Sequence, residues 1–137
     1  MNPMLRAMST VCVLLGATTV QAQPALKSGE QVYRETCMVC HGPGLANAPR
    51  LGDRQVWGKL ITEGQAVLTA HAWVGVRAMP PKGGRQDLSL EEFARAVAWM
   101  ARGSGGSWQD PDVRLLESIR AEERKRIEQL NRKPAKG

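Results

Sequence analysis

The sequence predicts an all-α fold, in which short helices form a small domain and a longer charged helix follows it. Ser28 and Ser89 each begin a capping box, a Ser or Thr followed three residues later by Glu or Gln, which is typical of a helix start. Phe93, Val97 and Met100 recur at the spacing of one buried helical face. Almost no segment shows the alternation of apolar and polar residues that is typical of a half-buried strand. These three observations favour helices packed on one another.

Four short helices are expected between residues 23 and 106. They are, in order, a helix from Ser28 towards Cys40, RQVWGKLI between Asp53 and Gly64, QAVLTAHAWV up to Gly75, and LEEFARAVAWMAR between Ser89 and Gly103. Two loops rich in Gly and Pro separate them, HGPGLANAPRLG and RAMPPKGGRQD. A domain with so much loop buries little apolar surface. The pattern therefore favours a bound group at the centre of the fold.

The C-terminal part, residues 107–137, is predicted to be a hinge and a charged helical extension. GSGGS, residues 103–107, has the composition of a flexible linker. Asp110 followed by Pro111 predicts a helix start, with the helix running to about Leu130 and possessing many Arg and Glu residues. Its apolar positions fit a heptad seam interrupted by Arg120 and Glu123, and they are Val113, Leu116, Ile127 and Leu130. The helix is either solvated with a weak docking stripe, or it binds a partner or a second copy through residues 110–131.

Residues 1–22 are predicted to be a cleaved signal peptide. Arg6 precedes an uncharged apolar run, and a cleavage site follows Ala22. The run is too short and too rich in Thr for a membrane span, although an uncleaved anchor is the alternative. Cleavage would remove Cys12 and leave Cys37 and Cys40 in a periplasmic protein with no stable membrane insertion.

Charge and composition narrow the function classes. The sequence has 19 Lys and Arg against 13 Asp and Glu, a net charge of +6. This diffuse excess suits an acidic protein partner, and it is too scattered to indicate nucleic acid binding. One Tyr and one Phe provide no stacking platform for bases.

The most informative motif is CMVCH, in which Cys37 and Cys40 are followed by His41. A redox dithiol would need a βαβ context, which the helical pattern does not supply. A zinc site would need four tetrahedral ligands, and only these three residues and His71 are available. C-x-x-C-H is the signature of covalent haem attachment, because two thiols in one helical turn can bond the vinyl groups while the next imidazole faces the iron. Haem attachment is the favoured interpretation.

A second iron ligand is expected downstream of this motif. Met79 lies in RAMPPKGG, where two prolines stiffen the backbone and two glycines permit close approach to a flat cofactor. Met100 belongs to a buried helical face, where core packing explains it. His71 lies within a helix, where a solvated or capping role is more common. Met79 is therefore the favoured ligand.

Several motifs now match a known family. They are Gly29, Tyr33, CMVCHGPG, NAPRLGD, Trp57 in QVWGKLI, AMPPKGG and AVAWM. With these, residues 27 to 102 resemble a class I cytochrome c, and they are most similar to the bacterial c5-type group. The sequence departs from many members of that group because it lacks their extra cysteine pair. Residues 107–137 have no counterpart in the resemblance.

The resemblance implies a fold of four short helices around one covalent haem c, with the domain spanning residues 23–106. It implies thioether bonds at Cys37 and Cys40, and axial iron ligation by His41 and Met79. The carbonyl of Pro49 would accept the ring N–H of His41 and fix its orientation.

The resemblance also implies the surroundings of the haem. Trp57 and Arg50 would lie near a propionate. Gly29 would let the first helix cross the last one closely, with Tyr33 and Trp99 packing at that crossing.

The function expected from this site is one-electron transfer by a periplasmic carrier, with no enzymatic activity. Two firm axial ligands leave the iron no open position, which favours electron transfer over peroxide or oxygen chemistry. Its partners would be a redox donor and a redox acceptor. One alternative is a haem subunit of a larger oxidoreductase, held through the C-terminal helix. Another is a peroxidase or gas sensor, which would require a loose Met79.

Overall fold

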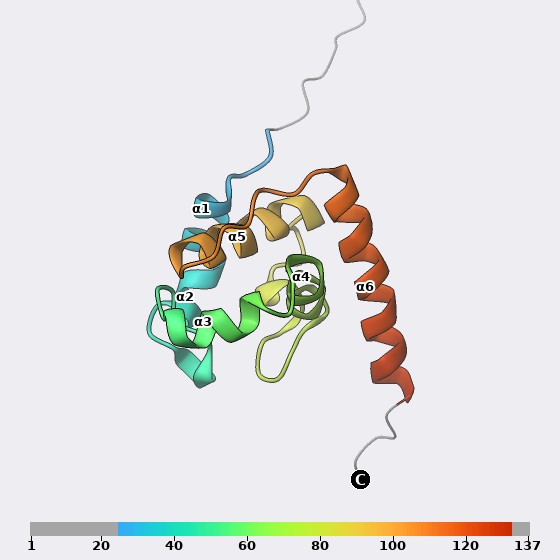
Figure 1. Cartoon of the computed structure of the whole chain (residues 1–137), viewed down its shortest axis with the longest axis horizontal. Helices are drawn as coiled ribbons and strands as arrows, with labels where there is room; N and C mark the ends of the chain where they lie inside the picture. The colour runs from blue at the N-terminus through green and yellow to red at the C-terminus, as the bar shows by residue number, and fades with distance from the viewer. Residues whose placement is uncertain (1–24, 133–137) are drawn as a thin grey trace, which may run out of the picture.

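The computed structural model describes residues 25–132, so the predicted signal peptide lies outside the described residues. These residues are helical, with a single isolated β-bridge and no strand. The elements, in order, are α1 (Gly29–Val32), η1 (Tyr33–Cys37), α2 (Met38–His41), η2 (Leu45–Asn47), α3 (Arg54–Ile61), α4 (Gln65–Val74), η3 (Pro81–Gly84), α5 (Leu90–Gly103) and α6 (Val113–Arg132). Figure 1 shows α4 near the centre of the molecule, with α6 along one side and the remaining helices on the other. The predicted all-α fold is confirmed.

The first predicted helix is present but is not uniform. α1, η1 and α2 follow one another without a break from Gly29 to His41, and η1 is a π-helical turn. Ser28 caps it as expected, because its Oγ accepts from Gln31 N at 3.2 Å. The reciprocal half of the capping box does not form, since the Gln31 side chain donates to Glu35 instead. Single π turns inside α-helices are frequent at functional sites, and this one ends at Cys37.

α1 and α5 cross closely at Gly29. A Cβ atom placed on Gly29 would lie 2.3 Å from the carbonyl oxygen of Arg95 and 2.9 Å from Cβ of Trp99. Tyr33 and Trp99 pack beside this point with ring centroids 4.8 Å apart. The expected close crossing is confirmed.

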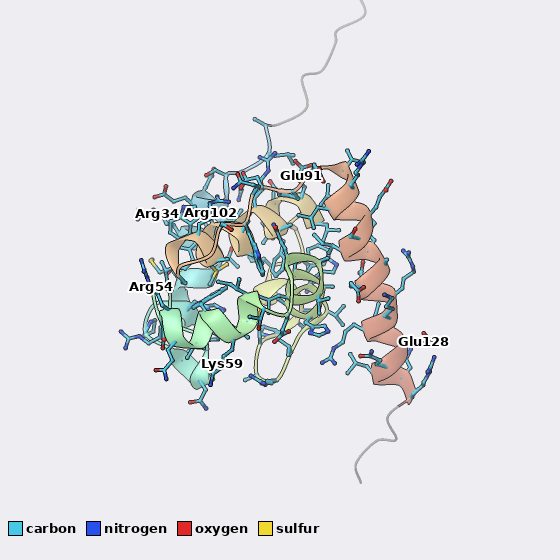
Figure 2. All side chains as sticks on the ribbon, viewed as in Figure 1. Arg34, Arg54, Lys59, Glu91, Arg102 and Glu128 are labelled. Carbon is cyan, nitrogen blue, oxygen red and sulfur yellow. The ribbon has the colours of Figure 1, made fainter. Side chains whose placement is uncertain are left out.

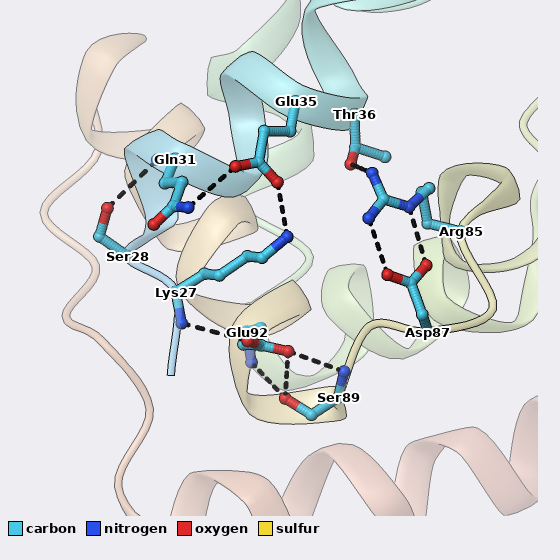
Figure 3. Close-up of polar contacts among 9 residues, drawn as sticks. All are labelled: Lys27, Ser28, Gln31, Glu35, Thr36, Arg85, Asp87, Ser89 and Glu92. Atoms are coloured by element: carbon cyan, nitrogen blue, oxygen red, sulfur yellow. Dashed lines mark hydrogen bonds and ion pairs between the residues drawn. The ribbon is translucent and has the colours of Figure 1, made fainter. Parts of the chain in front are cut away.

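Polar contacts tie the N-terminal segment and the loop before α5 to this crossing (Figure 3). Ser89 and Glu92 form the complete capping box that the sequence predicts for α5. The second carboxylate oxygen of Glu92 accepts from the backbone N–H of Lys27 at 3.1 Å. These hydrogen bonds from backbone N–H groups lower the pKa of Glu92. One carboxylate therefore caps α5 and holds the segment that leads into α1.

Three clusters of buried side chains form the core. The first comprises Val32, Leu88, Phe93, Ala96 and Val97. The second comprises Tyr33, Trp57, Met100 and Ala101. The third comprises Ala70, Leu90, Ala94 and Ile119. α5 contributes to all three, so it is the common wall of the core.

The segment predicted to be a hinge forms a defined helix end. Gly106 N donates to Ala101 O at 2.8 Å and Gly105 N to Arg102 O at 3.3 Å, which is a Schellman motif. Gly105 has a φ of 102°, a conformation that favours glycine. Beyond it, Trp108 packs against both the first and the second cluster. Residues 103–108 are thus part of the helix end and the core surface.

α6 begins later than the sequence predicts. It starts at Val113, and Asp112 caps it by accepting from Leu115 N at 2.8 Å. The predicted start at Asp110 and Pro111 is wrong, because the Asp110 carboxylate forms an ion pair with Arg102.

The buried face of α6 is also rotated from the predicted heptad seam. Ile119 is fully buried, with Leu115 and Leu116 beside it, whereas Val113 is 72% exposed. α6 therefore packs along α4 and the start of α5 through Leu115, Leu116 and Ile119, of which only Leu116 belongs to the predicted seam. No helix between residues 25 and 132 combines the length and the apolar character of a membrane span.

We predict that Gly29→Ala destabilises the protein, because the added methyl would clash with a backbone carbonyl that cannot move aside. The expected loss is about 1–3 kcal/mol of unfolding free energy. Gly58→Ala is the matched control, since its Cβ would meet nothing within 4 Å. That change should be neutral or stabilise α3 by up to about 1 kcal/mol. Guanidinium unfolding measures both, and an unchanged midpoint for Gly29→Ala would contradict the close crossing.

Candidate functional site

Cys37 and Cys40 lie where the π-helical turn meets α2. Neither forms a disulfide, and both are partly buried. Cys37 packs against both the first and the second core cluster. Burial, together with a smaller effect of nearby Cys40, raises the pKa of its thiol to about 11. A redox dithiol needs an attacking thiol of low pKa, so this environment does not suit that chemistry.

The zinc interpretation finds no ligand set in the described part of the chain. Between residues 25 and 132, no three His, Cys, Asp or Glu side chains gather in a way that would hold a metal ion. His71, the fourth candidate ligand, lies in α4 with its Nδ1 3.8 Å from a carboxylate oxygen of Glu63.

The side chain of His41 is oriented by the loop that follows it. Its Nδ1 lies 2.8 Å from the carbonyl oxygen of Pro49, the contact that the resemblance implies. Because a carbonyl can only accept, this contact places the proton on Nδ1 and leaves the Nε2 lone pair free. The loop closes on the same residue, since Leu51 N donates to His41 O at 2.8 Å. His41 can therefore present Nε2 to a metal in a fixed direction.

Trp57 supports this loop from α3 through the backbone of Arg50, which lies within the loop. Trp57 is 4% exposed, and its Nε1 donates to the carbonyl oxygen of Arg50 at 3.0 Å. The indole N–H is thus satisfied within the protein, while the side chain of Arg50 is exposed. Ser104 at the end of α5 adds a further tie, because its buried Oγ accepts from Gly52 N at 2.9 Å.

The loop that carries Met79 is built on the end of α4. Val76 and Met79 form a two-way β-bridge, with Val76 N to Met79 O at 3.1 Å and Met79 N to Val76 O at 2.9 Å. Gly75, with a φ of 101°, ends α4 where a Cβ atom would lie 3.1 Å from Pro81. Met79 is partly buried and packs against the first cluster, as Cys37 does.

The Met79 loop returns to the helix that carries the two cysteines. A Cβ atom on Gly83 would lie 3.4 Å from Cγ2 of Thr36, the residue before Cys37. Arg85 approaches the Thr36 hydroxyl at 3.5 Å while its guanidinium pairs with Asp87 (Figure 3). The fold thus brings together the segments that carry Cys37 and Met79.

The donor set and its surroundings fit a haem. Two thiols, an imidazole with a free Nε2 and a thioether are the groups that c-type haem sites use. Large apolar side chains next to the motif are exposed, among them Val39 at 68% and Leu45 at 57%. Met100, the competing methionine, is buried in the second cluster and packs as a core residue.

Trp73, near the end of α4, was not predicted to have a functional role. Its indole N–H donates to Glu123 of α6 at 3.0 Å, and Lys82 Nζ lies 4.5 Å from the centroid of its ring. A tryptophan placed just before the expected ligand loop was the one available signal. Its partners could not be found from the sequence, because Glu123 is fifty positions away.

Comparison with known proteins identifies the family. Residues 24–100 match the family model described as cytochrome C oxidase, cbb3-type, subunit III. Cytochrome c5 of Azotobacter vinelandii is 39% identical over 77 residues, which cover 55% of this chain and 93% of that protein. The chain belongs to the class I c-type cytochromes, within the c5-type group.

Two solved structures agree with this assignment. One is a chain from the crystal structure of the electron-transfer complex of nitrite reductase with cytochrome c, with a TM-score of 0.55 and 41% identity. The match covers 58% of this chain and 99% of that one. The other is a mono-haem ferrocytochrome c from Shewanella putrefaciens, with a TM-score of 0.51 and 31% identity, covering 56% of this chain and 95% of that one.

The family assignment fixes the general chemistry. This cytochrome carries one covalently bound haem c and transfers electrons, and it is not an enzyme. The match to the family model ends at residue 100, so α6 lies beyond it.

Proposed function

We propose that the protein is a periplasmic one-electron carrier whose haem is held by Cys37 and Cys40 and whose iron is ligated by His41 and Met79. The observation that supports this best is the return of the Met79 loop to the helix of the two cysteines, through Gly83 and Thr36. A loop packed there can offer a thioether to the same haem that the cysteines bond.

The residues would divide the work as follows. Bound haem supplies a couple between ferric and ferrous iron. Cys37 and Cys40 would each form a thioether and so fix the haem beside the core. His41 would offer Nε2, with Pro49 holding its ring. Met79 would offer a soft sulfur, which stabilises the ferrous state and raises the reduction potential.

Arg50 is better placed than Trp57 to meet a haem propionate directly. The Trp57 N–H is already donated to the Arg50 carbonyl, whereas the Arg50 side chain is exposed. Trp57 would act by holding the backbone of Arg50.

Location in the periplasm rests on the signal peptide proposed for residues 1–22. Covalent attachment needs thiols delivered outside the cytoplasm, which agrees with export. Free diffusion is favoured over a subunit role held through α6, because Leu115, Leu116 and Ile119 already pack within the chain.

A redox protein with an acidic docking surface would be the partner. A structural relative forms an electron-transfer complex with nitrite reductase, which supports a partner of this kind. Four basic residues lie on the Met79 loop, just after it or on α3, and they are Lys59, Arg77, Lys82 and Arg85. Of these, Lys82 lies over Trp73 and Arg85 pairs with Asp87. Lys59 and Arg77 are exposed, and Figure 2 shows Lys59 and Arg54 on α3, on the side away from α6. These exposed cations would steer an anion towards the haem.

We predict that Lys59→Glu slows oxidation of the ferrous protein by ferricyanide, a trianionic probe. At low ionic strength the slowing should be about two- to fivefold, and it should fade as salt screens the charge. Lys125→Glu on α6 is the matched control, because it changes the net charge by the same amount at a position far from α3. Stopped-flow kinetics measure the oxidation rates of both variants. Equal slowing by the two variants would contradict local steering by Lys59.

We predict that Met79→Ala abolishes the weak near-infrared sulfur-to-iron band of the oxidised protein. The ferrous variant should bind carbon monoxide, and the reduction potential should fall, because the soft sixth ligand is gone. Met100→Leu, a volume-conserving core change, should keep the band. Absorption spectra and a redox titration check this. Retention of the band in Met79→Ala would show that another residue ligates the iron.

A further inference from the structure

α4 is packed on two sides by elements that are far apart in the sequence. On one side lies α6, whose Ile119 is fully buried in the third cluster with Ala70 of α4. On the other side the Met79 loop folds back on α4, with Pro81 of η3 close to Gly75. Figure 1 shows α4 between α6 and the helix that carries the cysteines. Whatever fixes α4 therefore also fixes the base of the Met79 loop.

Trp73 is the residue that contacts both sides. Its Nε1 donates to Glu123 Oε1 of α6 at 3.0 Å. Lys82 Nζ lies 4.5 Å from the centroid of its ring, and Lys82 belongs to η3, three residues after Met79. The ring also packs edge-to-face on Phe93 of α5 at 5.3 Å. An indole held at its N–H by α6 thus presents its face to the ligand loop.

The backbone of Met79 depends on the same end of α4. Both of its β-bridge hydrogen bonds are made to Val76, two residues beyond the last residue of α4. Lys82 and Gly83 have φ values of 55° and 63°, so the loop turns sharply where Lys82 meets Trp73. A shift of Trp73 would move the bridge and the turn together, and the Met79 side chain with them.

We propose that α6 positions the distal iron ligand: through Glu123 and Trp73 it holds the Met79 loop closed. The inference rests on the proposed ligation by Met79. Glu123 and Trp73 are positioning residues, since they act on iron ligation through the loop. Loss of the Glu123 contact raises the fraction of molecules in which Met79 has left the iron.

Cyanide binding to the ferric holoprotein measures this fraction. An exogenous ligand binds only the open form. Its apparent dissociation constant is therefore inversely proportional to the fraction of molecules in the open form. Glu123→Ala removes the acceptor of this partly buried bond, and a typical intramolecular hydrogen bond is equivalent to a change of about three- to tenfold. We therefore expect Glu123→Ala to bind cyanide about three- to tenfold more tightly than the wild-type protein.

Three further variants define the mechanism. Glu123→Gln keeps an acceptor oxygen for the indole N–H, so its cyanide affinity should remain near that of the wild-type protein. Trp73→Phe removes the donor and also alters the ring contacts with Lys82 and Phe93, so it should bind cyanide at least as tightly as Glu123→Ala. Adding Glu123→Ala to Trp73→Phe should change the affinity no further. Glu117→Ala, an exposed carboxylate on the same helix, should have no effect.

Two outcomes overturn the inference. An unchanged cyanide affinity in Glu123→Ala would show that α6 does not act on the loop. A lower guanidinium midpoint with the same cyanide affinity would show a general stabilising role only. The near-infrared band of the wild-type oxidised protein separates these results from failure of the proposed function. If that band is absent, the ligation by Met79 fails and this inference fails with it.

Discussion

A methionine on an irregular loop keeps its direction only if the backbone around it is fixed, and this constraint organises much of the structure. Met79 lies outside any helix, so the bridge to Val76 and the packing of Pro81 near Gly75 replace helical hydrogen bonds. These contacts tie the loop to α4. α4 is in turn packed by α6 through Ile119. A weak ligand on an unsupported loop would leave the iron often enough to admit other chemistry.

His41 meets the corresponding requirement in a different way. It belongs to a helix, and what has to be fixed is the tautomer and rotation of its ring. Pro49 supplies a carbonyl at 2.8 Å, and the loop behind it is held by Trp57 and by Ser104. This support comes from α3 and from the end of α5, whereas the Met79 loop depends on α4 and α6. The two proposed ligands are therefore stabilised by separate parts of the chain.

Local signals in the sequence predicted most of the secondary structure. The caps at Ser28, Asp53 and Ser89 need only a side chain and an N–H three residues away, so their helices begin where expected. The start of α6 was misplaced because Arg102 takes Asp110 as a partner, which no local pattern reveals. The close crossing at Gly29 was predicted from the family resemblance. A glycine in the sequence does not by itself indicate which backbone segment packs against it.

The features that the sequence did not predict depend on contacts between distant segments. The heptad pattern placed Val113 on the buried face of α6, whereas Ile119 is the residue that α4 and α5 enclose. The choice depends on which face α4 offers, and periodicity does not contain that information. The hydrogen bond from Trp73 to Glu123 likewise joins residues fifty positions apart, so no local pattern predicts it. For the site, the spacing of the motif predicted the donor residues, and the structure added the contacts that orient them.

The central claim is that His41 and Met79 hold one covalent haem from two sides. The most direct test is the absorption spectrum of the full-length protein matured in a periplasm, recorded in the near infrared in the oxidised state. The account predicts haem that stays attached after denaturation and a weak sulfur-to-iron band in the native protein. Covalent haem without that band would contradict ligation by Met79, and haem lost on denaturation would contradict attachment at Cys37 and Cys40.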